Sequence, residues 1–425
     1  MTRSGFKYIK DVVPGEEVYA QDVNTKSGTW TEVKNVISLP NEKRELLSME
    51  SRVHSSLTTM GHRWFTHRRK TFPEWGFRLS SQLNSEDRIP LAVRLEAAKV
   101  ASVNDDIVDL VAWTYTEGSI SKSDSIWIYQ SKKVNPDYCQ RIENSLQALW
   151  GSGVETLGGV KDLEAWTVKC YDGESNQYHI NQNASRLLLQ HLDDKIPTYE
   201  FLNSLTLEQL DRFIEISILA DGSMRPNGAS VFVQKNARAI EAFAYACMLA
   251  GRPINIRTRI EDGFFSASLL DRKFVKPFAT PLATTFKRNE ILESDQEMFC
   301  LKTDHGTWVA ERNGSFYITG NCADHGIPHS EFLSWPEDDQ DKTIAWLLAK
   351  REVCDLCGTK ESDWVDERGW PLQDPPLTPV AHKCHGCAQK EQFRKANYKD
   401  GTPSGVTIIF MPSERVDSKG RIVRG

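Results

Sequence analysis

The sequence predicts an α+β protein with several domains, in which a β-rich domain is split by an α/β insertion and a small cysteine-containing domain follows. Short alternating strands with turn residues fill residues 1–100 and return at 281–321. The segment between them, 101–280, carries longer amphipathic stretches that are typical of helices. Residues 322–425 contain an acidic helical stretch, a proline-rich loop and paired cysteines. Because 425 residues exceed what one core usually holds, we expect these parts to fold as separate domains.

Bulk composition limits the classes of protein that this chain can be. Hydrophobic residues make up 40% and charged residues 26%, which is typical of a globular protein, and the net charge is -6. A surface that binds nucleic acid must therefore be local. Every apolar run is shorter than the ~18 residues that span a bilayer, and the first residues lack the apolar core of a signal peptide. We expect a cytoplasmic protein without a membrane partner, whose nine cysteines are thiols, metal ligands or nucleophiles rather than disulfides.

The helical segment contains an internal repeat. Glu117 opens an acid-Gly-Ser tripeptide that is followed by an apolar strand and then Gln130. Asp221 opens the same tripeptide and is followed in the same way by Gln234. The offset from acid to glutamine is 13 in both copies, and each copy continues into a helix closed by glycine. Two such units predict a domain with pseudo-twofold symmetry.

Two motifs in the β-rich segments point to chemistry on the peptide backbone. His62 closes a Thr-x-x-His motif that begins at Thr59, and the second segment ends in Asn321 followed by Cys322. The Asn321 side-chain amide can attack its own backbone carbonyl, which forms a succinimide and cuts the 321–322 bond. The Cys322 thiol can hold an acyl group as a thioester. His62 can protonate or polarise an amide at an upstream junction, and Thr59 can orient it.

Together these motifs resemble those of inteins, self-splicing elements built on the horseshoe-shaped Hint fold. Trp64, Cys300 and Thr319 also resemble the Trp, Cys and Thr set of the third mechanistic class of inteins. In that class an internal cysteine attacks the upstream junction directly. The resemblance implies that Cys300 carries the branched thioester and that Cys322 then receives the acyl group. It implies a function in autocatalytic protein splicing at Asn321–Cys322.

The chain departs from the intein pattern at two places. Position 320 is glycine, where most inteins have histidine, so cyclisation of Asn321 needs another helper. A water molecule or another side chain, with His305 as one candidate, would serve. The segment Met1–Gly5 resembles one that normally lies inside an intein, so the first intein residues and the upstream host segment are expected to be missing. We therefore expect at most cleavage at the C-terminal junction rather than splicing in cis.

The repeat carries a second resemblance. Residues 110–118 (LVAWTYTEG) and 214–222 (IEISILADG) resemble the paired motifs of LAGLIDADG, or DOD-type, homing endonucleases. The resemblance implies two motif helices side by side, with Glu117 and Asp221 binding Mg²⁺ next to the scissile phosphates. It implies strands lying in the major groove of double-stranded DNA at the intein insertion site. The enzyme is then expected to act as a monomer.

Two features of the endonuclease interpretation stay open. Lys273 and Lys276 are the candidates for an accessory lysine that polarises the attacking water, although a solvated surface charge is the alternative for each. Trp113, Tyr115 and Thr116 stand in the first motif where the family has small or aliphatic residues. The second motif is close to consensus, so the shared spacing to glutamine is what favours the pair.

The C-terminal segment carries two Cys-x-x-Cys pairs, a spacing that suits tetrahedral Zn²⁺. The segment resembles small zinc-binding proteins encoded among the tail genes of bacteriophages, which implies a zinc-ribbon-like host domain behind the splice junction. The expected ligands are Cys354, Cys357, Cys384 and Cys387.

Two alternatives to an intein with an embedded endonuclease remain. One is a DNA-binding or DNA-cutting protein with a zinc module, intact or decayed, in which the Hint-like segments are only scaffold. The other is a Hint protein of the hedgehog or bacterial-toxin type, which cleaves without ligating. The adjacent Asn321 and Cys322 favour the first interpretation.

Overall fold

The structure is a computed structural model that describes residues 1–39, 43–68, 74–96, 100–155, 164–224, 230–259, 262–277, 290–294 and 297–321, with isolated positions from 338 onward. The chain divides into two units, Met1–Trp335 and Pro336–Gly425. The helices and strands with defined bounds all belong to the first unit. The sequence predictions for Cys322, Cys354, Cys357, Cys384 and Cys387 lie outside the described residues.

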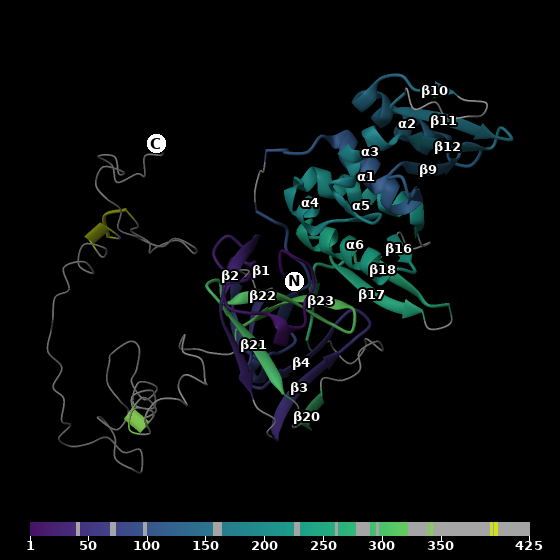
Figure 1. Cartoon of the computed structure of the whole chain (residues 1–425). Coiled ribbons are helices and arrows are strands. Elements are labelled where there is room, and N and C mark those ends of the chain that lie inside the picture. The colour runs from purple at the N-terminus through teal and green to yellow at the C-terminus, as the bar shows by residue number, and fades with distance from the viewer. Residues whose placement is uncertain are drawn as a thin grey trace, which may run out of the picture. The chain divides into compact units, whose positions relative to one another are not determined.

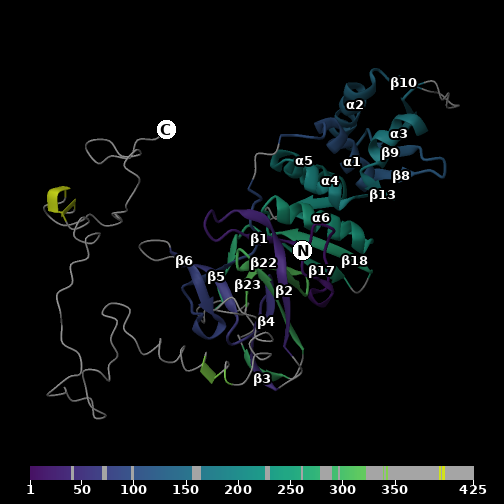
Figure 2. The ribbon, with the colours of Figure 1, turned by 60° about the vertical axis from the view of Figure 1, so that its left-hand side comes forward.

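Strands from both ends of the first unit build its β-rich part. β2 (Gly28–Leu39) pairs antiparallel with β21 (Met298–Thr303), and β3 (Arg44–Glu50) pairs antiparallel with β20 (Glu290–Ser294). Figures 1 and 2 show these purple and green strands side by side in one body. The other elements of this part are η1 (Ile9–Asp11), β1 (Glu17–Gln21), β4 (Ser55–Thr59), β5 (Arg63–Arg68), β6 (Glu74–Leu79), η2 (Ser80–Gln82), β7 (Asp87–Pro90), β22 (Thr307–Arg312) and β23 (Ser315–Gly320).

The hairpin β22–β23 has the tight turn that its sequence predicts. Asn313 and Gly314 both have positive φ, at 51° and 75°, as a two-residue turn between twisted strands requires. All six residues of β23 are buried. The hairpin therefore brings the end of β23, and with it Asn321, into the interior of the β-rich part.

The helical part repeats one order of elements. In the first copy α1 (Asp105–Glu117) leads to β8 (Gly118–Ile120), β9 (Ile126–Ser131), α2 (Pro136–Trp150), β11 (Trp166–Tyr171) and β12 (Ser175–Ile180). In the second, α5 (Leu207–Asp221) leads to β15 (Gly222–Met224), β16 (Ser230–Gln234), α6 (Ala237–Leu249), β17 (Ile254–Arg259) and β18 (Phe264–Leu269). The strand order β8-β9-β12-β11 in one sheet corresponds to β15-β16-β18-β17 in the other. The smaller elements are β10 (Val154–Glu155), α3 (Gln182–Leu189), β13 (Leu192–Asp193), β14 (Ile196–Pro197), α4 (Tyr199–Ser204) and β19 (Phe274–Val275).

The two long helices α1 and α5 begin and end by the same local rules. The side chain of Asn104 caps α1 by accepting from the amide of Asp106, and Thr206 caps α5 in a reciprocal pair with Gln209. Each helix ends at a glycine because a Cβ there would overlap the carbonyl oxygen four residues earlier, that of Thr114 or of Ile218. The glycine that follows each acid in the repeat is therefore required by close approach.

The insertion and the β-rich part share one hydrophobic core. Tyr19 and Phe316 from the β-rich part belong to the same buried cluster as Phe243 and Leu249 of α6. The hairpin turn also docks on β17, because the amide of Ile256 donates to the Gly314 carbonyl at 2.8 Å. The described residues thus form a mixed α/β structure with mostly antiparallel sheets.

Candidate functional site

His62 and Thr319 meet inside the β-rich part although 257 residues separate them. His62 immediately precedes β5, and Thr319 lies near the end of β23. The Nε2 atom of His62 is 2.6 Å from the hydroxyl oxygen of Thr319. Both side chains are buried, with 6% and 2% of their surface exposed. Thr319 therefore holds the imidazole in a fixed orientation next to the end of β23.

Trp64 forms one wall beside His62. Its ring lies edge-on to the imidazole, with 5.1 Å between ring centroids, and is fully buried. The indole N–H donates to the hydroxyl of Ser80 at 3.0 Å, and this hydroxyl lies 2.9 Å from that of Thr58. Ser80, in η2, and Thr58, on β4, were not found from the sequence, because isolated serine and threonine residues carry no spacing signal.

Thr59 contributes to the site through its backbone. Its carbonyl accepts from the amide of His62 at 3.1 Å, which closes the turn between β4 and β5. The spacing of the Thr-x-x-His motif is thus the spacing of a tight turn that leads into β5.

Cys300 lies near the same strand end. It lies on β21, opposite Ile37 of β2, and only 1% of its surface is exposed. Its Sγ is 4.0 Å from the carbonyl oxygen of Gly320 and 3.7 Å from that of Leu301. The thiol therefore lies next to the backbone that leads into Asn321.

Asn321 is held by the turn between β21 and β22. Its backbone N–H donates to the Gly306 carbonyl at 3.1 Å, and its side-chain amide donates to the Thr303 carbonyl at 3.4 Å. Its Oδ1 is buried and has no hydrogen-bond partner among the described residues. Both nitrogens of Asn321 thus donate to carbonyls of one turn, which limits the orientation of its side chain.

Gly320 shows why the usual histidine is absent from this position. A Cβ on Gly320 would overlap the carbonyl oxygen of Arg63, which lies between His62 and Trp64. The close approach of β23 to β5 that brings Thr319 to His62 excludes a side chain at 320. His305, the candidate helper, lies in the turn that holds Asn321, and its Nδ1 is 3.4 Å from a carboxylate oxygen of Asp22.

The two repeat acids end the helices α1 and α5, which lie against each other. Burial, and after it the charge of Asp221, raises the pKa of Glu117 from 4.5 to about 7, while Lys195 acts in the opposite direction. Burial also raises the pKa of Asp221, although the Gln234 amide that donates to it lowers the pKa. Two half-buried carboxylates whose charges repel each other are an arrangement that a divalent cation relieves.

The lysine beside these acids is Lys195, which lies between β13 and β14. Its ammonium donates to the carbonyls of Thr116 and Gly118 at 3.2 and 3.3 Å, on either side of Glu117. Sequence reasoning missed it because Lys195 lies far along the chain from both motifs.

Lys273 and Lys276, the sequence candidates for an accessory lysine, lie beside strands of the β-rich part. The two lysines flank β19, which pairs with β7 in the β-rich part, and Val275 between them is buried in that core. The chain has thus already returned to the β-rich part before residue 280. Neither lysine affects the pKa of Glu117 or Asp221.

The two copies of the repeat are not equivalent at their glutamines. The side-chain amide of Gln234 donates to the carboxylate of Asp221. In the other copy, the side-chain oxygen of Gln130 instead accepts from the side-chain amide of Asn135 at 3.1 Å. The Gln130 amide nitrogen is buried and has no partner among the described residues. The unusual aromatic residues of the first motif are accommodated, since Trp113 packs against Tyr138 of α2.

Comparison with known proteins gives structural neighbours only. No protein-family model and no curated protein matches the chain. Among solved structures, mesophilic variants of the homing endonuclease I-DmoI match with a TM-score of 0.28 and 10% identity, over 40% of this chain and 84% of that one. I-DmoI in complex with DNA and Mn matches with a TM-score of 0.28 and 11% identity, over 39% and 91%. At this level of similarity the neighbours do not establish a fold or a function for this chain.

None of the described helices is long and apolar enough to span a bilayer.

Proposed function

We propose that this chain is an intein-type self-processing element that cuts its own backbone between Asn321 and Cys322. The observation that carries the proposal is the convergence of His62, Cys300 and Asn321 at the end of β23. Residues from distant segments gather around the backbone that leads to the scissile bond. An ordinary scaffold has no need to bring a histidine, a thiol and an asparagine to one strand end.

The proposed cleavage needs only groups of the chain itself. The Nδ2 atom of Asn321 attacks the carbonyl carbon of its own residue, and the bond to the nitrogen of residue 322 breaks. Nδ2 loses a proton and the departing amine gains one, so no other reactant is consumed. The bond from Nδ2 to the Thr303 carbonyl increases electron density on that nitrogen and orients it. In a chain that carries an upstream junction, the Cys300 thiol would attack the carbonyl carbon of that junction and the C–N bond would break. The thiol proton would pass through His62 to the leaving amine, and the acyl group would be held on Cys300 as a thioester.

The test is to follow the intact chain after purification. We expect release of a fragment that begins at Cys322 and a partner that ends in a cyclic imide, lighter by one water than the hydrolysed acid in mass spectrometry. Asn321→Ala removes the nucleophile and should abolish both products. Asn144→Ala, at an exposed asparagine of α2, is the matched control and should cleave normally. Cleavage that persists in Asn321→Ala would disprove the mechanism.

A second function is supported by a separate observation, the carboxylate pair Glu117 and Asp221. We propose that the inserted domain cuts double-stranded DNA with the help of a divalent cation such as Mg²⁺, as a monomer. When bound, the metal activates water and stabilises the leaving oxygen of the phosphodiester. The chain supplies the two carboxylates that hold the cation, and Lys195 places a positive charge beside them.

DNA cleavage is tested with a plasmid that carries the host coding sequence without the intein. We expect nicking that requires Mg²⁺ and is lost in Asp221→Ala. Asp137→Asn, at an exposed acid in the first turn of α2, should retain it. Binding without cutting, by wild type and variant alike, would show that the domain only binds DNA.

A further inference from the structure

The turn that holds Asn321 is itself attached to the end of β1. The Thr307 hydroxyl donates to the Gln21 carbonyl at 2.5 Å and accepts from the Gln21 amide at 3.0 Å. Within the turn, the Thr303 hydroxyl donates to the Thr307 carbonyl at 3.0 Å. The position of both carbonyls that bind Asn321 therefore depends on the contact between this turn and β1.

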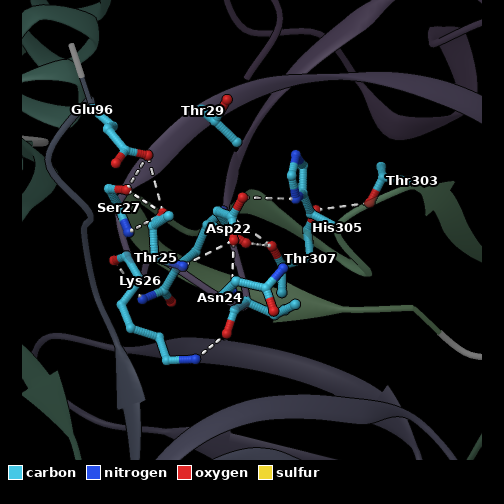
Figure 3. A network of polar contacts seen from close by, with 12 residues as sticks. Asp22, Asn24, Thr25, Lys26, Ser27, Thr29, Glu96, Thr303, His305 and Thr307 are labelled. Atoms are coloured by element: carbon cyan, nitrogen blue, oxygen red, sulfur yellow. Dashed lines mark hydrogen bonds and ion pairs between the residues drawn. The ribbon is translucent and has the colours of Figure 1, made fainter. Parts of the chain in front are cut away.

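The contact ends in an ion pair between Asp22 and His305, which Figure 3 draws at the centre of a polar network. The Asp22 carboxylate is held in place independently of the imidazole, because its Oδ1 accepts from the backbone amides of Asn24 and Thr25 at 2.6 and 3.0 Å. These amide donors lower the pKa of Asp22, so its carboxylate stays ionised. The other carboxylate oxygen, Oδ2, is 3.4 Å from Nδ1 of His305.

Other charges near the pair are engaged elsewhere. Lys26, in the loop after β1, donates to the Val23 carbonyl and attracts Asp22 only at longer range. Asp304, next to His305, pairs with Lys34 of β2 at 3.5 Å. Glu96 accepts from the Thr25 and Ser27 hydroxyls on the far side of the loop. Asp22, which directly follows β1, is thus the charged group that pairs with His305.

We propose that Asp22 and His305 are positioning residues for cleavage at Asn321, and that they do the work of the histidine that cannot fit at position 320. The inference rests on the proposed self-cleavage. His305 does not touch the reacting atoms. Its ion pair with Asp22 holds the Thr303–Gly306 turn, and through it the Asn321 amide, in the reactive orientation.

The test is the rate of cleavage at 321–322 in the intact chain at one fixed pH. We expect His305→Gln and Asp22→Asn each to cleave about two- to fivefold more slowly than wild type, the range that one partly exposed ion pair allows. The double variant should be no slower than either single variant, because both changes remove the same contact. His305→Arg keeps a cationic partner for Asp22, so it should restore most of the wild-type rate.

Asp193→Asn is the matched control, because it removes another exposed ion pair, that of Asp193 with Arg238, in the inserted part. It should keep the wild-type rate. His305→Gln with an unchanged rate would overturn the positioning role while leaving self-cleavage intact. A wild-type chain that does not cleave at any pH would instead overturn the proposed function.

Discussion

The carboxylate pair and the cluster of His62, Cys300 and Asn321 at the end of β23 (the β23-end cluster) are built from the sequence in different ways. Each acid of the pair ends its own helix, and both helices follow one local rule: a cap, an amphipathic helix and a glycine. In the β23-end cluster, Cys300 and Asn321 come from one stretch of consecutive strands, whereas His62 reaches them only because β5 packs against β23. The pair should therefore be sensitive to charge, and the cluster to the spacing between backbones.

The largest expected effect comes from adding one methyl group next to the β23-end cluster. In Gly320→Ala the new Cβ meets the carbonyl oxygen of Arg63, so β23 must move away from β5. We expect cleavage at 321–322 to be lost, with a decrease in stability of about 1–3 kcal/mol from overpacking. The measurement is fragment release together with unfolding by urea. Gly61→Ala is the control, since no atom lies within 4 Å of a Cβ there. Normal cleavage in Gly320→Ala would mean that the β5–β23 spacing is not needed.

The next effect changes charge at the carboxylate pair. Lys195→Met removes the ammonium beside Glu117 and keeps the length of the side chain. We expect DNA nicking to fall about a hundredfold, because the positive charge beside the carboxylates would no longer stabilise negative charge in the transition state. Lys273→Met is the matched control, because that lysine lies next to β19 in the β-rich part. Equal losses in the two variants would show that only general attraction to DNA is affected.

A smaller effect concerns the support of Trp64. Ser80→Ala leaves the buried indole N–H and the Thr58 hydroxyl without their shared partner. We expect stability to fall by about 1–3 kcal/mol, measured as a lower midpoint of urea unfolding. Ser123→Ala, at an exposed serine, should leave the midpoint unchanged. A neutral Ser80→Ala would imply that water replaces the hydroxyl.

The sequence predicts features that follow local rules better than features that depend on contacts between distant segments. The repeat, the glycine at each helix end and the Asn-Gly turn are local patterns, and the structure has them where they were expected. Lys195, Ser80 and the Asp22–His305 pair depend on which distant segments meet, and no spacing in the chain encodes that. The placement of Lys273 and Lys276 depends on the same kind of long-range contact, because a two-residue strand decides which part of the molecule they join.

The smallest effect is a pH dependence of stability that comes from the carboxylate pair and not from the β23-end cluster. The pKa of Glu117 is raised from 4.5 to about 7, so between these values the folded metal-free protein binds a proton that the unfolded chain has released. Stability should therefore decrease as pH rises from about 5 to about 7, by about 1 kcal/mol after allowance for solvent screening. Glu117→Gln cannot ionise, so it should lose this decrease and be the more stable form at pH 8. The measurement is the unfolding midpoint of both proteins across this range without metal. Parallel curves would place the ionised carboxylate in water, and the repulsion that a cation is proposed to relieve would not exist.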